Sequence, residues 1–153
     1  MTDLKRILLA EDDPKDVELT LAALAQHNLA NEVITVHDGE QAMAYLRKEG
    51  TFLKRSNGNP VVAILDLKMP KVDGLEVLRQ IRADAQLKTI PVVMLTSSRE
   101  EKDLVESYRL GINAYVVKPV DFAEFMKAVK DLGVFWAVVN EPPPGSIRKT
   151  AQG

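Results

Sequence analysis

The sequence predicts an α/β fold in which helices cover both faces of one five-stranded parallel sheet. Short apolar runs alternate with amphipathic segments five times along the chain, which is typical of repeated strand–helix units. The runs at 61–65 and 92–95 are apolar without alternation, as in strands that are buried on both faces. Residues with helix-capping chemistry follow several of the runs, so each strand is expected to lead into a helix.

The first half of the chain contains two of the expected strand–helix units. Their strands are expected near 6–10 and 32–36. Asp13 suits the N-cap of the first helix and Pro14 its first helical position, and a second helix is expected from Asp38 onward. The expected inward-facing residues are Val17, Leu21, Leu24 and Ala25 in the first helix, and Ala42, Tyr45 and Leu46 in the second.

Three further units follow a polar loop at 50–60. The expected strands are 61–65, 92–95 and 114–117, and the expected helix starts are Asp73, Ser98 and Asp121. Ser98 and Asp121 each precede a glutamate at capping-box spacing. With right-handed crossovers the strands form a doubly wound sheet. The order 2-1-3-4-5 of the flavodoxin-like class is one solution, which spacing alone does not prove.

Four of the apolar runs end at polar residues that suit a phosphate-and-metal site. Glu11 and Asp12 follow the first run, Asp66 the third, Thr96 the fourth and Lys118 the fifth. In a parallel sheet these residues gather at the carboxyl edge, where open α/β sheets bind ligands. Three acids suit a hard divalent cation, and the hydroxyl and ammonium groups suit phosphoryl oxygens.

An acid at a strand end often serves only as a helix cap or a solvated loop residue. Asp13 fits the capping role, because it directly precedes Pro14. Glu11 and Asp12 both precede that cap, and two adjacent acids that leave a buried strand repel each other unless a cation is near. A functional role is therefore the preferred interpretation of this pair and of Asp66.

Length and composition narrow the classes of function. The chain has 153 residues, no cysteine, and 20 basic against 22 acidic residues. This length favours one domain, and the balanced charge gives no electrostatic case for binding nucleic acid. No apolar run approaches the roughly 20 residues of a membrane span, and no secretory signal begins the chain. We expect a cytoplasmic protein with no direct contact with nucleic acid or membrane.

Four features together resemble the receiver domain of two-component response regulators, over about residues 5–132. They are Glu11-Asp12, Asp66 in the segment Leu-Asp-Leu-Lys-Met-Pro-Lys-Val-Asp-Gly, Thr96 after Val-Val-Met-Leu, and Lys118-Pro119. The resemblance implies the flavodoxin-like sheet of order 2-1-3-4-5. It also implies that the protein accepts a phosphoryl group from a sensor histidine kinase and catalyses only its own phosphorylation and slow dephosphorylation.

The resemblance assigns a role to each residue of the site. The implied cofactor is Mg²⁺, for which Mn²⁺ or Ca²⁺ substitutes. The implied ligands of Mg²⁺ are Asp12 and Asp66 directly, Glu11 through water, and the backbone carbonyl of Lys68. The implied phosphoacceptor is Asp66, the implied contacts of the phosphoryl oxygens are Thr96 and Lys118, and the implied switch residues are Thr96 and Tyr115.

The C-terminal part of the sequence predicts a surface that contacts another protein molecule. Residues 132–144 look like the tail of regulators that are paired with phytochrome-type histidine kinases, and the expected domains are a receiver at 1–140 and a Pro-rich extended or disordered tail at 141–153. The segment 134–139 is apolar on every side, so either it folds back on its own domain or it forms a homodimer interface. We favour a dimer that involves Phe122, Phe135 and Trp136, and a regulator without an output domain.

Two rival functions have features that distinguish them. A phosphatase of the aspartyl-phosphate type would need a second carboxylate two residues after Asp66, where Lys68 stands. A flavin-binding carrier on the same fold would need a hydroxyl-rich phosphate loop after the first strand, where Glu11 and Asp12 stand.

Overall fold

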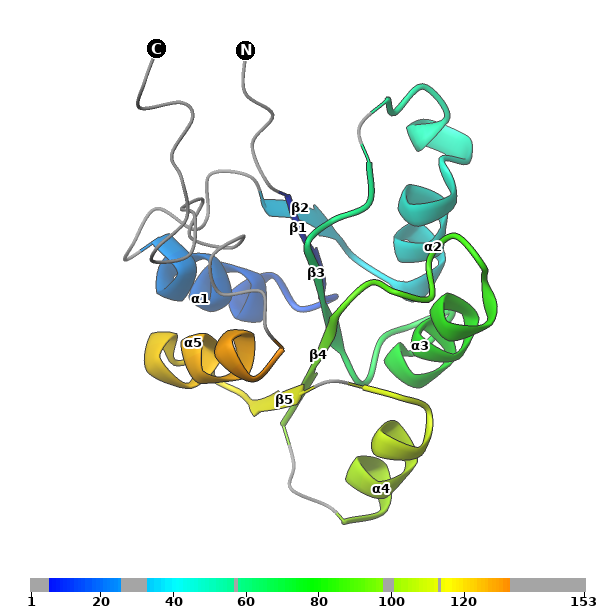
Figure 1. Cartoon of the computed structure of the whole chain (residues 1–153). Helices are drawn as coiled ribbons and strands as arrows, with labels where there is room; N and C mark the ends of the chain where they lie inside the picture. The colour runs from blue at the N-terminus through cyan, green and yellow to red at the C-terminus, as the bar shows by residue number, and fades with distance from the viewer. Residues whose placement is uncertain (1–5, 26–32, 57, 98–100, 113, 133–153) are drawn as a thin grey trace, which may run out of the picture.

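The computed structural model describes residues 6–25, 33–56, 58–97, 101–112 and 114–132 and forms one five-stranded sheet (Figure 1). The strands are β1 (Ile7–Ala10), β2 (Val33–Val36), β3 (Val62–Asp66), β4 (Val92–Thr96) and β5 (Ala114–Val117). All neighbouring strands are parallel, in the order β2-β1-β3-β4-β5. The predicted fold class and strand order are therefore confirmed, and the order changes direction between β1 and β3.

Helices cover both faces of this sheet. They are α1 (Pro14–Ala25), α2 (Gly39–Arg47), α3 (Gly74–Ala83), α4 (Glu101–Arg109) and α5 (Phe122–Asp131), with a short 3-10 helix, η2 (Gly50–Phe52). In Figure 1, α1 and α5 lie on one side of the sheet and α2 and α3 on the other, with α4 beside α3. Among the described residues, no helix is long and apolar enough to cross a lipid bilayer.

Each strand sends alternate side chains into two separate cores, because successive residues of a strand point to opposite faces. In β1, Leu8 and Ala10 join the core beneath α2 and α3. Ile7 and Leu9 join the core beneath α1 and α5. All residues of β1, β3 and β4 are buried. The continuous apolar runs that predicted central strands are thus explained by burial on both faces.

Three helices begin at the aspartates that the sequence places there. The side chain of Asp38 accepts a hydrogen bond from the Gln41 backbone N–H at 2.7 Å. Asp73 and Asp121 accept in the same way from the residues three positions later, at 2.9 and 3.1 Å. An N-cap carboxylate satisfies a backbone N–H group that lacks a partner within the helix. These contacts fix where α2, α3 and α5 start.

The structure corrects several details of the expected elements. β3 and β4 each run one residue further, so Asp66 and Thr96 end their strands instead of following them. Ala25 is exposed and Ala23 is buried in its place, because α1 packs on the sheet through a slightly different stripe. The loop at 50–60 contains η2, in which Phe52 packs edge-on against Tyr45 with ring centroids 5.2 Å apart.

Some predictions concern residues outside the described part of the chain. Ser98, Phe135, Trp136 and the tail at 141–153 belong to this group. The predicted helix start at Ser98, the Phe135–Trp136 part of the interface and the domain boundary at 140 therefore remain predictions.

Candidate functional site

Backbone hydrogen bonds hold Glu11, Asp66 and Lys118 at one edge of the sheet. The Glu11 N–H donates to the Val36 carbonyl at 3.0 Å, which continues the pairing of β1 with β2. The Lys118 N–H donates to the Thr96 carbonyl at 2.8 Å. Asp66 pairs with Leu95 inside the sheet itself. The functional side chains therefore start from a rigid frame.

Three acids converge at this edge. Ligand oxygens of Glu11, Asp12 and Asp66 all lie within 4.8 Å of one another. Glu11 and Asp66 are buried, at 0% and 5% exposure, whereas Asp12 is exposed. Hard divalent cations such as Mg²⁺ prefer carboxylate oxygens. The donor set therefore fits a divalent cation that reaches the acids from the solvent side at Asp12.

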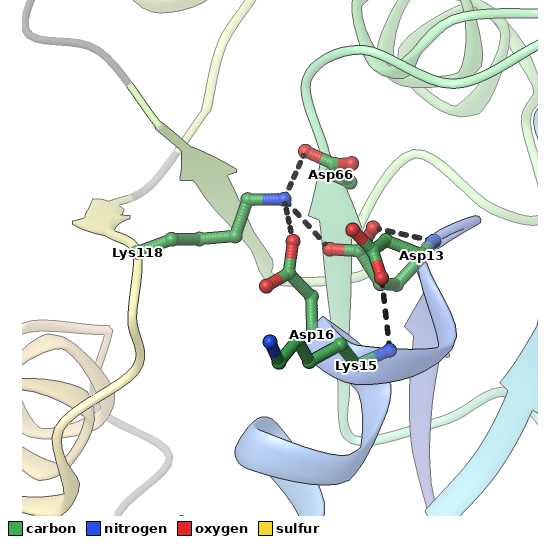
Figure 2. A network of polar contacts seen from close by, with 6 residues as sticks. Asp13, Lys15, Asp16, Asp66 and Lys118 are labelled. Atoms are coloured by element: carbon green, nitrogen blue, oxygen red, sulfur yellow. Dashed lines mark hydrogen bonds and ion pairs between the residues drawn. The ribbon is translucent and has the colours of Figure 1, made fainter.

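Lys118 reaches across the sheet edge to this acid group, as Figure 2 shows. Its ammonium group lies 2.9 Å from Glu11 Oε1 and 3.3 Å from Asp66 Oδ1. The third partner is Asp16, in the first turn of α1, with Oδ2 at 2.9 Å. One ammonium group thus forms ion pairs with three carboxylates, and Asp12 adds a fourth acidic side chain nearby.

This crowding changes the acidity of the buried groups. Burial raises the pKa of Glu11 to about 7, and the neighbouring Asp66 adds to the rise, although Lys118 lowers it. Burial also raises the pKa of Asp66. For Lys118, burial alone would lower the pKa, but hydrogen bonds to Asp16 and Glu11 outweigh it and raise the value. The site holds its negative charge at an energetic cost that a second cation would relieve.

A groove of about 210 Å³ lies over these acids. Thr96 and Lys68 line it together with Asp66 and Lys118. Thr96 is 2% exposed. A hydroxyl, an ammonium and a buried carboxylate that share one groove are suited to hold a phosphoryl group, because each of the first two donates hydrogen bonds to phosphoryl oxygens.

Two glycines allow the loop after β3, which carries Lys68, to lie close to its neighbours. A Cβ atom on Gly39 would stand 1.9 Å from the Val72 carbonyl oxygen, and one on Gly74 would stand 2.3 Å from the Asp66 carbonyl oxygen. Any larger residue would push the backbone apart at these points. The loop is therefore packed directly against the start of α2 and the end of β3.

Tyr115 lies outside the groove that contains the acids. Its ring contacts Tyr108 edge-on, with centroids 6.1 Å apart. Both tyrosines line a second groove, of about 280 Å³, beside α5. The structure thus brings together the predicted metal and phosphoryl residues and places the predicted switch tyrosine on the surface beside them.

Phe122 is the one predicted interface residue that the structure describes. It is partly buried and packs against the core beneath α1 and α5. Its ring therefore contributes to the core of its own domain, whatever further contact it makes.

Sequence reasoning missed Asp16. An acid in the first turn of a helix is common, because it interacts favourably with the helix dipole, so Asp16 gave no separate signal. Its contact with Lys118 joins positions 102 residues apart. Asp13, in contrast, caps α1 as predicted, since its Oδ1 accepts a hydrogen bond from the Lys15 N–H at 2.8 Å.

Comparisons with known proteins agree with this geometry. Residues 7–130 match the family described as the response regulator receiver domain. The response regulator Rcp1 of Synechocystis sp. (strain ATCC 27184 / PCC 6803 / Kazusa) is 39% identical over 132 residues, which are 86% of this chain and 88% of Rcp1. A solved structure of Rcp1, described as its Mn²⁺-bound form, has a TM-score of 0.71 at 35% identity and covers 94% of this chain and 99% of that one.

Two further solved structures are similar. The bacteriophytochrome response regulator RtBRR has a TM-score of 0.82 at 62% identity, over 98% of this chain and 90% of that chain. The phosphorylated cyanobacterial phytochrome response regulator RcpA has a TM-score of 0.72 at 43% identity, over 88% of this chain and 94% of that one.

Proposed function

Because the chain belongs to the response regulator receiver family, we propose that it receives a phosphoryl group on Asp66 and signals through protein contacts. The observation that carries this proposal is the position of Asp66. Its carboxylate is buried, ends a central strand, and lies beside Lys118 and two further acids. The phosphorylated state named for RcpA supports the same role.

The proposed metal ligands are Glu11, Asp12, Asp66 and the backbone carbonyl of Lys68. The first three are the acids whose oxygens lie within 4.8 Å of one another. Mg²⁺ is the proposed cation, with Mn²⁺ or Ca²⁺ as substitutes, and the Mn²⁺-bound form of Rcp1 supports this choice. When bound, the cation supplies positive charge that offsets repulsion between the acids and an incoming phosphoryl group.

The chain's own residues perform the transfer. An Asp66 carboxylate oxygen attacks phosphorus, the bond from phosphorus to the phosphohistidine nitrogen breaks, and its electron pair stays on the imidazole. Lys118 and Thr96 donate to the phosphoryl oxygens, where charge is spread in the transition state. The hydrogen bond between the Lys118 N–H and the Thr96 carbonyl fixes the backbone from which both donor side chains start.

The proposed signal passes from Thr96 to Tyr115. Thr96 moves toward the phosphoryl oxygens, and Tyr115 turns inward from the groove beside α5. This couples a local change of charge to the surface of β5 and α5. The protein then catalyses only its own phosphorylation and slow dephosphorylation, whereas a phosphatase acts on a separate phosphorylated substrate. The presence of Lys68 two residues after Asp66 supports that distinction.

The proposed partner is a sensor histidine kinase of the phytochrome type, in the cytoplasm. Support comes from RtBRR and RcpA, both described as phytochrome response regulators. We also propose a homodimer that involves Phe122, Phe135 and Trp136, because the apolar segment 134–139 is too large to leave in water. Sedimentation of the Phe135→Glu/Trp136→Glu protein is expected to show monomers where the parent forms dimers. A parent protein that is already monomeric would exclude this interface.

Intact-mass spectrometry tests the function. After incubation with acetyl phosphate and Mg²⁺, the unaltered protein is expected to gain one phosphoryl group, and Asp66→Asn is expected to gain none. Asp73→Asn is the matched control, because Asp73 also lies on the loop side of β3 but caps α3. Equal labelling of the Asp66→Asn protein would refute the proposal.

A further inference from the structure

The geometry points to Asp16 as a positioning residue that draws the Lys118 ammonium toward α1 and so leaves Glu11 and Asp66 available to a divalent cation. This inference rests on the proposed function, because it concerns the same metal site. It adds Asp16, which was not predicted from the sequence and is not one of the three acids that fit a metal ion.

The first step is the set of partners of Lys118. Three carboxylates surround its ammonium group, and Asp16 and Glu11 are equally close, at 2.9 Å, while Asp66 is at 3.3 Å. An ammonium group has three N–H donors, so all three contacts are compatible with one position of the side chain. Figure 2 shows Asp16 pointing from α1 toward Lys118.

The second step is the difference among these partners. Glu11 and Asp66 belong to the group of acids that fits a cation, and Asp16 does not. The side chain of Asp16 is also 28% exposed, against 0% and 6% for the other two. A bound cation and the ammonium compete for the oxygens of Glu11 and Asp66, since both are positive. Asp16 offers the ammonium a partner outside this competition.

The third step is the support that holds Asp16 in place. Asp13 caps α1 and fixes its first turn, and Pro14 is pre-shaped for the first helical position. Asp16 is thus presented from the start of a packed helix. Without its charge, Lys118 would have only Glu11 and Asp66 among the acids that contact it in the described structure. The ammonium would then bind these two acids more tightly and oppose the cation.

The experiment is a double-mutant cycle with Mg²⁺ alone as the probe and its affinity measured by isothermal titration calorimetry. Asp16→Asn is expected to weaken Mg²⁺ binding by about threefold to fivefold, the range for a partly exposed ion pair. Asp13→Asn is the matched control, because it removes an acid from the same groove that makes no contact with Lys118 in the described structure. Asn also caps helices well, so α1 is preserved.

The same two substitutions are then made in a Lys118→Met protein. The effect of Asp16→Asn is expected to shrink there to the effect of Asp13→Asn, because the ammonium that Asp16 holds is gone. Asp16→Glu, which keeps the charge, is expected to restore the Mg²⁺ affinity to within about twofold of the parent value. Circular dichroism confirms that each variant is folded.

The outcomes separate the inference from the proposed function. If Asp16→Asn has the same effect with and without Lys118, then Asp16 acts only as a general negative charge and the inference is overturned. It is also overturned if Asp16→Asn and Asp13→Asn are equal in the parent protein. Failure of the unaltered protein to bind Mg²⁺ would instead overturn the proposed function, and the inference with it.

Discussion

The aspartates that cap helices and the acids that form the site lie along the same sheet edge but in opposite electrostatic settings. Asp73 and Asp121 each stand alone at a helix start and accept a hydrogen bond from a backbone N–H. Glu11 and Asp66 instead share one ammonium group with Asp16. Burial raises the pKa of both site acids.

The difference shows that the surroundings of an acid decide whether it stabilises the fold. A cap gains a backbone donor and a favourable helix dipole. The charged form of a crowded, buried carboxylate is destabilised by desolvation and by repulsion from its neighbours. We therefore expect the ionised site acids to lower the stability of the metal-free protein, and a bound cation to offset that loss.

The largest expected effect that tests this comparison is on metal binding. Asp66→Asn is expected to weaken Mg²⁺ affinity by at least about 10–100-fold, the range found when even indirect partners of a metal are removed. The metal-free variant is expected to be more stable than the parent, because one buried negative charge is lost. Calorimetric melting with and without Mg²⁺ measures both effects. A metal-free variant less stable than the parent would contradict the comparison.

Removal of a helix cap is expected to lower the stability of the protein and to leave metal binding unchanged. Asp121→Ala is expected to lower the free energy of unfolding by about 1 kcal/mol and to leave Mg²⁺ affinity unchanged, because Asp121 lies at the start of α5. Urea unfolding measures the loss. Asp121→Asn serves as the control, since an Asn cap is expected to retain most of the stability; an equal loss in both variants would argue against capping.

A further expected effect is on the pH dependence of stability. Glu11 ionises near pH 4.5 in the unfolded chain and near 7 in the folded protein. Between these values the folded state binds more protons, so this group makes stability fall as pH rises from about 4.5 to about 7. Urea unfolding at pH 5 and pH 8 without metal is expected to show the fall.

Two further measurements identify the group responsible for this fall. In Glu11→Gln the fall is expected to be smaller, and with saturating Mg²⁺ it is expected to disappear. The window avoids Glu76, whose pKa is lowered to about 2 by Arg79 and whose contribution is lost only as pH falls below about 4.5. The same fall in Glu11→Gln as in the parent would assign the effect to another group.

Much of the fold and of the acid cluster was predictable, because local rules decide them. Capping residues set the start of α2, α3 and α5, and burial on both faces sets the composition of β3 and β4. The convergence of Glu11, Asp12 and Asp66 follows from parallel strands that end at one edge. These features need no knowledge of how a helix is rotated about its axis.

The remaining features depend on packing that a single sequence does not express. The contact of Asp16 with Lys118 requires the rotation of α1 relative to β5, which many side chains decide together. The same holds for Tyr115, whose surroundings depend on where α4 places Tyr108. Phe122 illustrates the point, since a residue predicted for an interface also packs on its own core.

The close approach of Gly39 to the Val72 carbonyl has a mechanical consequence. On that flank of Asp66 the backbone segments touch with no space for even a methyl group, so this contact itself has no room to absorb a displacement. On the opposite flank, the groove beside Tyr115 leaves about 280 Å³ open. A movement that starts at Asp66 is therefore expected to bypass this contact, and the groove beside β5 and α5 offers it room.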